Sequence, residues 1–312
     1  MRAVVVKSGK LLLEERPDPQ PGSHELLVRV RAAGLNGADM LQRKGAYPAP
    51  PGSPEDIPGL ELAGEVSARG PGASRFDDGG RVMAIVGGGA QAELALVHER
   101  AAMPVPEGLD WPAAGGLPKV FVTAHDALFT QAALRPGERL LVHGGAGGVG
   151  SAAIQLGRAA GARVTATVRR DELRPEVERL GAEAIAPEGF EERGPFDVVL
   201  ELVGAPNLAG NLKALGMAGR IVVIGVGAGA KAELNLVALM GKRGTLRGST
   251  LRARPLEEKA LAMRLVEREL LPLFDAGKLR VPVAATYALD QAEQAYERFE
   301  GGGKLGKIVL TL

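Results

Sequence analysis

The sequence contains no cysteine, which excludes disulfide bonds, cysteine-ligated zinc, iron–sulfur clusters and thiol catalysis. Aromatic residues are also scarce, at 4% of the chain. The 38 basic residues nearly balance the 37 acidic ones, so the formal net charge is +1. A near-neutral chain without a basic block argues against nucleic acid or an anionic membrane as a partner. The four histidines are scattered without the spacing of metal ligands, so we expect no zinc site.

Apolar stretches of membrane-spanning character are also missing. Residues 140–157 carry no charged side chain, but glycines and the polar residues His143, Ser151 and Gln155 interrupt them. A loop that opens a helix fits this stretch better than a membrane span. Near the N-terminus, Lys7 and Lys10 stand where a signal peptide needs its apolar core. We therefore expect a soluble cytoplasmic protein that does not bind membranes.

The 312 residues suffice for about two domains. Over the first hundred residues, short apolar runs alternate with Pro and Gly clusters, which is typical of small twisted sheets. From about Pro118, strands alternate with helices, which predicts a parallel sheet covered by helices on both faces. After Leu251 the pattern resembles that of the first part again. We predict a discontinuous β-rich domain, residues 1–117 and 253–312, with a doubly wound α/β domain, residues 118–252, inserted into it.

The sharpest motif is the glycine-rich loop HGGAGGVG, residues 143–150, between a predicted strand and a predicted helix. Its G-x-G-x-x-G pattern lets the chain turn tightly, approach a pyrophosphate and pack the helix close to the strand. The helix that follows presents free N–H groups and a partial positive charge to phosphates. The alternative is a glycine-rich turn that binds nothing. The expected dinucleotide contacts are Gly145, Ala146, Gly147, Gly148, Val149 and Gly150.

The choice of cofactor depends on the end of the next predicted strand. NAD sites have an acidic residue there, about 20 residues past the loop, which holds the ribose hydroxyls. This chain instead has Arg169, 19 residues after Gly150, followed by Arg170. Guanidinium groups bind the 2′-phosphate of NADPH well, so the pair predicts NADPH. Two ordinary surface arginines are the alternative.

Six stretches carry a resemblance to a known family: AAGLNGADMLQRKGAYP (32–48), PGLELAGEV (58–66), VTAHDAL (122–128), HGGAGGVGSAAIQL (143–156), FDVVLELVG (196–204) and GKLGKIVL (303–310). Over essentially its whole length the chain resembles the zeta-crystallin-like quinone oxidoreductases, a zinc-free branch of the medium-chain dehydrogenase/reductase superfamily. The resemblance implies a GroES-like catalytic domain with an inserted Rossmann domain and NADPH as cofactor. It also implies a homodimer, for which we expect edge strands near Gly244–Thr250 to pair.

Site residues follow from the same resemblance. Tyr47 is the expected hydrogen-bond donor to the acceptor, unless it merely packs on the proline-rich loop. Asn36 and Asp39 are expected to shape the same site, although both are also common turn residues. Thr123 resembles the family threonine that touches the nicotinamide side, unless it is simply a buried helix threonine. Lys307 is either a phosphate ligand or an exposed strand lysine. The remaining implied cofactor contacts are Val203, Gly204, Gly225, Val226, Gly248 and Ser249.

Without a metal to stabilise an alkoxide, hydride transfer to a conjugated acceptor is favoured over alcohol oxidation, because a quinone or enone spreads the developing charge itself. We therefore predict an NADPH-dependent quinone oxidoreductase. One alternative is an NADPH-dependent reductase of enone or enoyl-thioester double bonds. Another is an NADPH-binding protein without turnover that serves a structural or sensing role, as lens crystallins do.

Overall fold

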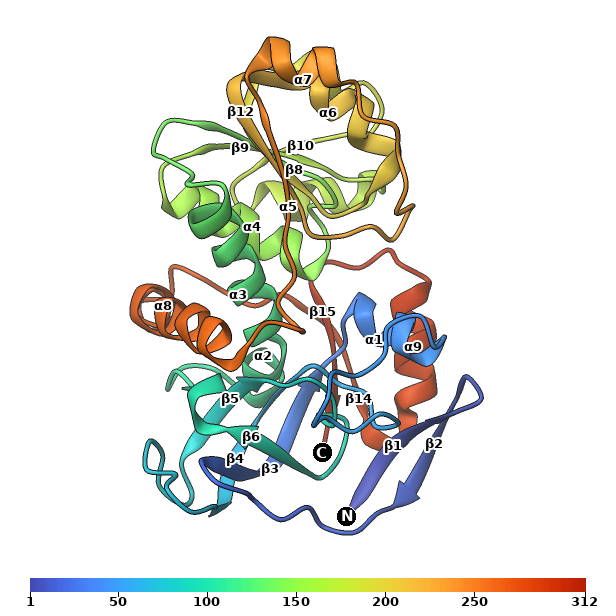
Figure 1. Ribbon diagram of the computed structural model, residues 1–312, viewed down its shortest axis with the longest axis vertical. Helices are drawn as coiled ribbons and strands as arrows, with labels where there is room; N and C mark the ends of the chain where they lie inside the picture. The colour runs from blue at the N-terminus through green and yellow to red at the C-terminus, as the bar shows by residue number, and fades with distance from the viewer. The chain divides into compact units, whose positions relative to one another are not determined.

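The computed structural model describes all residues from Met1 to Leu312, which form two compact units (Figure 1). The first unit consists of Met1–Val122, Leu251–Gly302 and Lys307–Leu312. The second unit consists of Thr123–Thr250 and Gly303–Gly306, so the chain passes between the units four times. The sequence alone does not predict that Gly303–Gly306 joins the second unit. None of the helices combines the length and apolar character that a membrane span requires.

Two sheets form the β-rich framework of the first unit. A two-stranded antiparallel sheet pairs β1 (Arg2–Lys7) with β2 (Lys10–Glu15). The seven-stranded sheet has the order β14-β15-β3-β4-β5-β7, and β6 also pairs with β3. Its strands are β3 (Glu25–Gly34), β4 (Glu61–Arg69), β5 (Arg81–Ile85), β6 (Leu94–His98), β7 (Ala102–Pro104), β14 (Val283–Ala288) and β15 (Lys307–Thr311). The last strand therefore lies inside a sheet that the first hundred residues begin.

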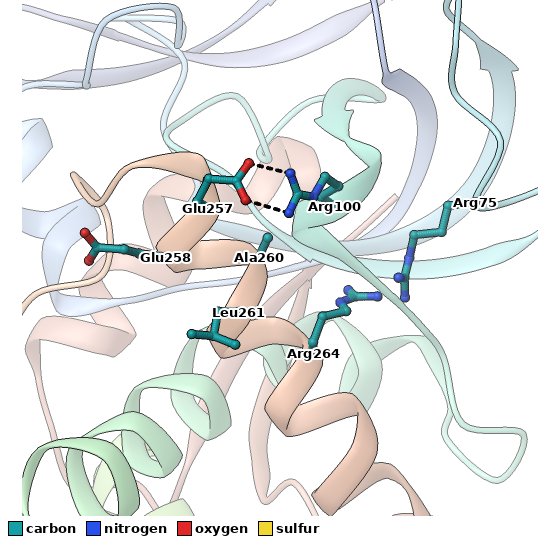
Figure 2. Close-up of a pocket in the computed structure, with 7 residues that line it drawn as sticks. All are labelled: Arg75, Arg100, Glu257, Glu258, Ala260, Leu261 and Arg264. Carbon is teal, nitrogen blue, oxygen red and sulfur yellow. Dashed lines mark hydrogen bonds and ion pairs between the residues drawn. The ribbon is translucent and has the colours of Figure 1, made fainter.

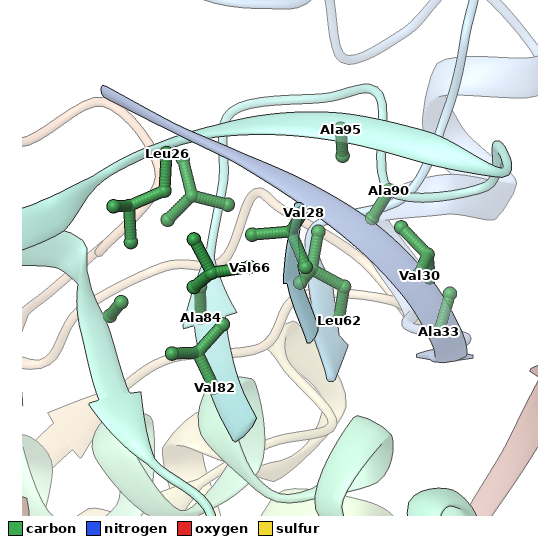
Figure 3. Close-up of a cluster of buried hydrophobic side chains, with 12 residues drawn as sticks. Leu26, Val28, Val30, Ala33, Leu62, Val66, Val82, Ala84, Ala90 and Ala95 are labelled. Atoms are coloured by element: carbon green, nitrogen blue, oxygen red, sulfur yellow. The ribbon is translucent and has the colours of Figure 1, made fainter. Parts of the chain in front are cut away.

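Alternation along the strands explains the core of this sheet. Successive side chains of a strand point to opposite faces, so every second residue of β3 enters the core: Leu26, Val28 and Val30. Figure 3 shows these side chains facing those of the neighbouring strands. The other members of this cluster are Ala33, Leu62, Val66, Val82, Ala84, Ala90, Ala95, Val97 and Ala102.

Helices complete the first unit. A second apolar cluster joins the sheet residues Ile308 and Leu310 to Ala295 and Tyr296 of α9. The long helix α8 begins directly after Pro255. The helices of this unit are α1 (Gly37–Arg43), α2 (Trp111–Gly116), α8 (Leu256–Asp275) and α9 (Ala292–Glu300), and α3 (Pro118–His125) leads into the second unit.

The second unit is built on six parallel strands in the order β10-β9-β8-β11-β12-β13. Counted within this unit, the order is 3-2-1-4-5-6, that of a doubly wound dinucleotide-binding sheet, which confirms the predicted fold class. The strands are β8 (Arg139–Val142), β9 (Arg163–Thr167), β10 (Glu183–Ile185), β11 (Phe196–Glu201), β12 (Leu215–Val223) and β13 (Thr245–Gly248). The connecting helices are α4 (Gly148–Ala159), α5 (Arg174–Glu178), α6 (Leu208–Ala214) and α7 (Leu236–Lys242).

Candidate functional site

The carboxyl edge of the parallel sheet gathers most of the predicted cofactor residues. Because the strands run parallel, the loops that follow them lie at one edge, where such sheets bind their ligands. Of the predicted cofactor residues, Lys307 alone lies outside the second unit. The residues at this edge are Gly145–Gly150 after β8, Arg169 and Arg170 after β9, Val203 and Gly204 after β11, Gly225 and Val226 after β12, and Gly248 and Ser249 at the end of β13.

The glycine-rich loop leaves room for a ligand above Gly147. A Cβ atom on Gly150 would lie 2.3 Å from the Gly144 carbonyl oxygen, and one on Gly145 would lie 2.8 Å from the Ala166 Cβ. These two glycines therefore let the loop, the strand and the helix pack closely. A Cβ atom on Gly147 would meet only the Gly144 oxygen, at 3.3 Å. Gly147 also caps α4, whose first N–H groups have no partner within the helix.

Segment 303–306 lies against the glycine-rich loop, a contact that the sequence did not predict. The N–H of Gly306 donates to the Ala146 carbonyl oxygen at 2.8 Å, and Gly306 forms an isolated β-bridge with Gly147. A Cβ atom on Gly303 would lie 2.8 Å from Cζ of Arg170. Segment 303–306 thus borders both the glycine-rich loop and Arg170. It belongs to the stretch GKLGKIVL, residues 303–310, but nothing in that stretch predicted its contact with the loop.

The two arginines after β9 are exposed. Nη1 of Arg170 lies 3.5 Å from Oε1 of Glu172, and both side chains face solvent, so this ion pair is weak. The guanidinium of Arg169 makes no ion pair within its unit. The free N–H groups at the start of α4 and the cations after β9 fit the phosphate groups of a nicotinamide dinucleotide.

A buried ion pair in the first unit overturns the prediction for Lys307. Its ammonium group contacts Oε1 of Glu61 at 2.6 Å, the Leu35 carbonyl oxygen at 2.5 Å and Oδ1 of Asn36 at 3.0 Å. An ammonium group has three N–H donors, and all three are used here. The Lys307 side chain is 3% exposed. The prediction that Lys307 binds a phosphate is therefore wrong.

Asn36 and Asp39 belong to the same buried cluster. Nδ2 of Asn36 donates to Oε1 of Glu61 at 2.9 Å. The carboxylate of Asp39 accepts the N–H of Asn36 at 2.7 Å and that of Gly59 at 3.2 Å. Burial raises the pKa of Asp39 to about 6, although these hydrogen bonds act in the opposite direction. Asp39 has no exposed surface, so its side chain is not accessible to an acceptor in this structure.

Tyr47 is held by an arginine that the sequence did not reveal as a site residue. Its ring lies 4.7 Å from Cζ of Arg252, a cation–π contact. Arg252 also donates to the Tyr47 carbonyl oxygen at 3.0 Å and to Oε1 of Gln42 at 2.7 Å. Arg252 is almost fully buried, whereas Tyr47 is half-buried. The phenol is thus fixed in orientation while part of it remains accessible.

Helix α3 carries Lys119 and Thr123, which are four residues apart and therefore lie on one face of the helix. The hydroxyl of Thr123 is buried and has no hydrogen-bond partner, as expected of a group that meets a ligand or water. The backbone N–H of Lys119 donates to Oε2 of Glu61 at 2.8 Å. Desolvation lowers the pKa of Lys119 to about 8, and Glu61 and Asp39 act in the opposite direction. Lys119 was not predicted as a site residue.

A separate cavity of about 470 Å³ in the first unit contains none of these residues (Figure 2). Its arginines are already paired: Arg100 with Glu257, and Arg75 with Glu267 at 2.6 Å. Arg264 also contacts Glu267, at 2.5 Å. We assign this cavity no catalytic role, because its charges neutralise one another.

Comparisons with known proteins agree with this architecture. Residues 22–107 match the family model "Alcohol dehydrogenase GroES-like domain", and residues 180–310 match "Zinc-binding dehydrogenase". The quinone oxidoreductase of Mus musculus is 34% identical over 310 residues, which cover 94% of this chain and 91% of that protein. An alcohol dehydrogenase superfamily protein from Novosphingobium aromaticivorans superposes with a TM-score of 0.88 and 30% identity, over 100% and 99% of the two chains. The structure of an NAD-dependent alcohol dehydrogenase superposes with a TM-score of 0.88 and 28% identity, over 100% of each chain.

The zinc in the second family description has no matching donor set in this chain. No group of three or more His, Asp or Glu side chains is arranged to hold a metal ion, and cysteine is absent. The rest of the architecture agrees with the family: a GroES-like first unit, a doubly wound second unit with its glycine-rich loop, and 34% identity over nearly the whole chain. The chain therefore belongs to the quinone oxidoreductase family, within the medium-chain dehydrogenase/reductase superfamily of nicotinamide-dependent oxidoreductases.

Proposed function

We propose that the chain reduces quinones with NADPH. The observation that carries the choice of cofactor is the arginine pair after β9, where an NAD site would have a carboxylate. Arg169 is exposed and makes no ion pair within its unit, so its guanidinium is available for a 2′-phosphate. The family relationship supports a quinone as the acceptor.

The reaction needs little from the protein beyond positioning. When bound, NADPH supplies a hydride, and the acceptor takes up one further proton at oxygen to give the hydroquinone. The glycine-rich loop and α4 would bind the pyrophosphate, and the Thr123 hydroxyl would contact the nicotinamide side. Tyr47, oriented by Arg252, would donate a hydrogen bond to the acceptor oxygen. We propose that no metal takes part, since a quinone delocalises the developing charge.

One experiment tests this function directly. NADPH and NADH oxidation is measured against quinones, alkenals and enoyl thioesters in parallel, with and without a metal chelator. We expect the highest kcat/KM with NADPH and a quinone, unaffected by chelator. A preference for alkenals or enoyl thioesters would identify a double-bond reductase instead. NADPH binding without turnover on any acceptor would indicate a non-catalytic role.

We further propose that the protein is a homodimer joined through β13. This strand lies at the end of its sheet and pairs only with β12, so its other edge is open. The neighbouring helix α7 exposes three large apolar side chains: Leu236, Val237 and Met240. An open edge beside exposed apolar residues suits pairing with a second copy across a two-fold axis.

A further inference from the structure

His143, the first residue of the glycine-rich loop, belongs to a hydrogen-bonded network of four buried polar side chains. His143, Thr167, Glu201 and Asn211 are each at most 3% exposed. Nδ1 of His143 lies 3.1 Å from Oγ1 of Thr167, and Nε2 lies 2.7 Å from Oδ1 of Asn211. Nδ2 of Asn211 donates to Oε2 of Glu201 at 2.7 Å. Four polar groups are thus satisfied without water.

The direction of each hydrogen bond follows from the carboxylate. Glu201 can only accept, so the Asn211 amide turns its NH₂ to Glu201 and its oxygen to His143. His143 must therefore carry its proton on Nε2, and its Nδ1 accepts from the Thr167 hydroxyl. Burial lowers the pKa of His143, although Glu201 acts in the opposite direction, so burial favours the neutral ring. Phe190 packs edge-on against the ring, with centroids 4.6 Å apart, and fixes its plane.

The two end residues of this network, Thr167 and Glu201, accept hydrogen bonds from the backbone of predicted cofactor loops. Oγ1 of Thr167 accepts the N–H of Gly144, the second residue of the glycine-rich loop, at 3.2 Å. Oε1 of Glu201 accepts the N–H groups of Val203 at 2.6 Å and of Gly204 at 2.8 Å. The residues come from β9, the end of β8, the end of β11 and α6. The first three elements are neighbours in the sheet order β9-β8-β11.

We propose that Thr167, His143, Asn211 and Glu201 are positioning residues that hold the glycine-rich loop and the 203–204 turn ready for the dinucleotide. The inference rests on the proposal that these two loops bind the cofactor. An apolar cluster would fill the same space at no desolvation cost, but it would leave the N–H groups of Gly144, Val203 and Gly204 unpaired. Loops that are ordered before binding lose less conformational entropy when the cofactor arrives, so affinity rises.

The test uses an isosteric substitution at Thr167. Thr167→Val keeps the shape and the β-branch but removes both hydrogen bonds of the hydroxyl, whereas Thr167→Ser keeps the hydroxyl. Thr165→Val is the matched control, because Thr165 is a buried threonine of the same strand outside the network. Cofactor Kd is measured by nucleotide fluorescence, and folding is checked by circular dichroism. Hydrogen exchange of the Gly144 amide and nitrogen-15 shifts of the histidines report the network itself.

We expect Thr167→Val to raise the Kd for NADPH and for NADH alike by about tenfold, because the hydroxyl's hydrogen bonds to Gly144 and His143 are lost. The kcat should be nearly unchanged. The Gly144 amide should exchange faster, and the Nε2–H signal of His143 should change. Thr167→Ser and Thr165→Val should bind as the wild type does. An unchanged Kd for Thr167→Val, or an equal rise for Thr165→Val, overturns the inference while the proposed function stands. If the wild type binds neither NADPH nor NADH, the inference and the proposed function both fail.

Discussion

The ammonium group of Lys307 lies 2.6 Å from the carboxylate of Glu61, and both side chains are almost completely removed from solvent. Removal of one partner from a buried ion pair leaves an uncompensated charge, which costs about 3–5 kcal/mol. We therefore expect Lys307→Met to lower the free energy of unfolding by about that amount in urea titrations. The double variant Lys307→Met with Glu61→Gln should recover part of the loss.

The exposed pair Lys44–Glu300 provides the control for this prediction, since its side chains are 63% and 40% exposed. Lys44→Met should change the free energy of unfolding by no more than about 1 kcal/mol. Equal effects of the two lysine substitutions would contradict a structural role for the buried pair.

The raised pKa of Asp39 predicts that the free energy of unfolding falls as the pH rises. Burial raises this pKa from 3.8 to about 6, so between these values the folded protein holds a proton that the unfolded chain has released. Protonation therefore stabilises the fold, and this contribution is lost as pH rises through 6. Relative to Asp39→Asn, the wild type should lose about 2–3 kcal/mol of unfolding free energy between pH 4 and pH 7. Parallel pH profiles of the two proteins in urea titrations would rule this out.

The arginine pair after β9 predicts cofactor preference. Each charged contact to the 2′-phosphate contributes about 1.5–3 kcal/mol, and solvent exposure moves the sum toward the lower end. We expect kcat/KM with NADPH to exceed that with NADH by about 100-fold and the ratio to fall with added salt. Arg169→Ala with Arg170→Ala should raise KM for NADPH and leave NADH unaffected.

Arg163, exposed at the opposite end of β9, gives the control for cofactor preference. Arg163→Ala should leave both cofactors unaffected. Equal use of NADH and NADPH by the wild type would show that the arginine pair does not select the cofactor.

Tyr47 is expected to assist hydride transfer through one hydrogen bond. Tyr47→Phe should lower kcat by about 10- to 100-fold, because one lost donor costs about 1.5–3 kcal/mol. Tyr287→Phe, in β14 of the same unit, should leave kcat unchanged. Complete loss of activity in a folded Tyr47→Phe protein would mean that the phenol performs an essential step and that positioning alone is insufficient.

Dimerisation through β13 and α7 is tested by charge substitutions at exposed apolar positions. Val237 and Met240 are 79% and 74% exposed in the single chain. Val237→Asp with Met240→Asp should leave the fold intact and shift the light-scattering mass toward the 32.4 kDa of the monomer. Leu261→Asp, at a residue 62% exposed on α8, should not change the mass. A monomeric wild type at micromolar concentration would refute the dimer.

The second unit was predictable from the sequence because its signals are local. The glycine-rich loop directly follows its strand, and the arginine pair follows the next strand, so spacing alone places both at one sheet edge. The short helices α1, α2 and α7 were not predicted, since six or seven residues give too little periodicity.

The error at Lys307 and the omission of Arg252 have the opposite cause. Glu61 is 246 residues from Lys307, and Gln42 is 210 residues from Arg252. Burial and pairing over such separations depend on the tertiary fold. No spacing rule reveals them.

The four passages of the chain between the two units bear on the order in which the units are completed. Strand β15 lies between β14 and β3, and segment 303–306 bonds the glycine-rich loop, so both units receive parts from residues 303–312. These residues follow every other part of both units in the sequence, so they leave the ribosome after them. Neither the central sheet nor the nucleotide loop can be completed before residues 303–312 have emerged. A stop codon that removes residues from 303 onward therefore disables both units at once.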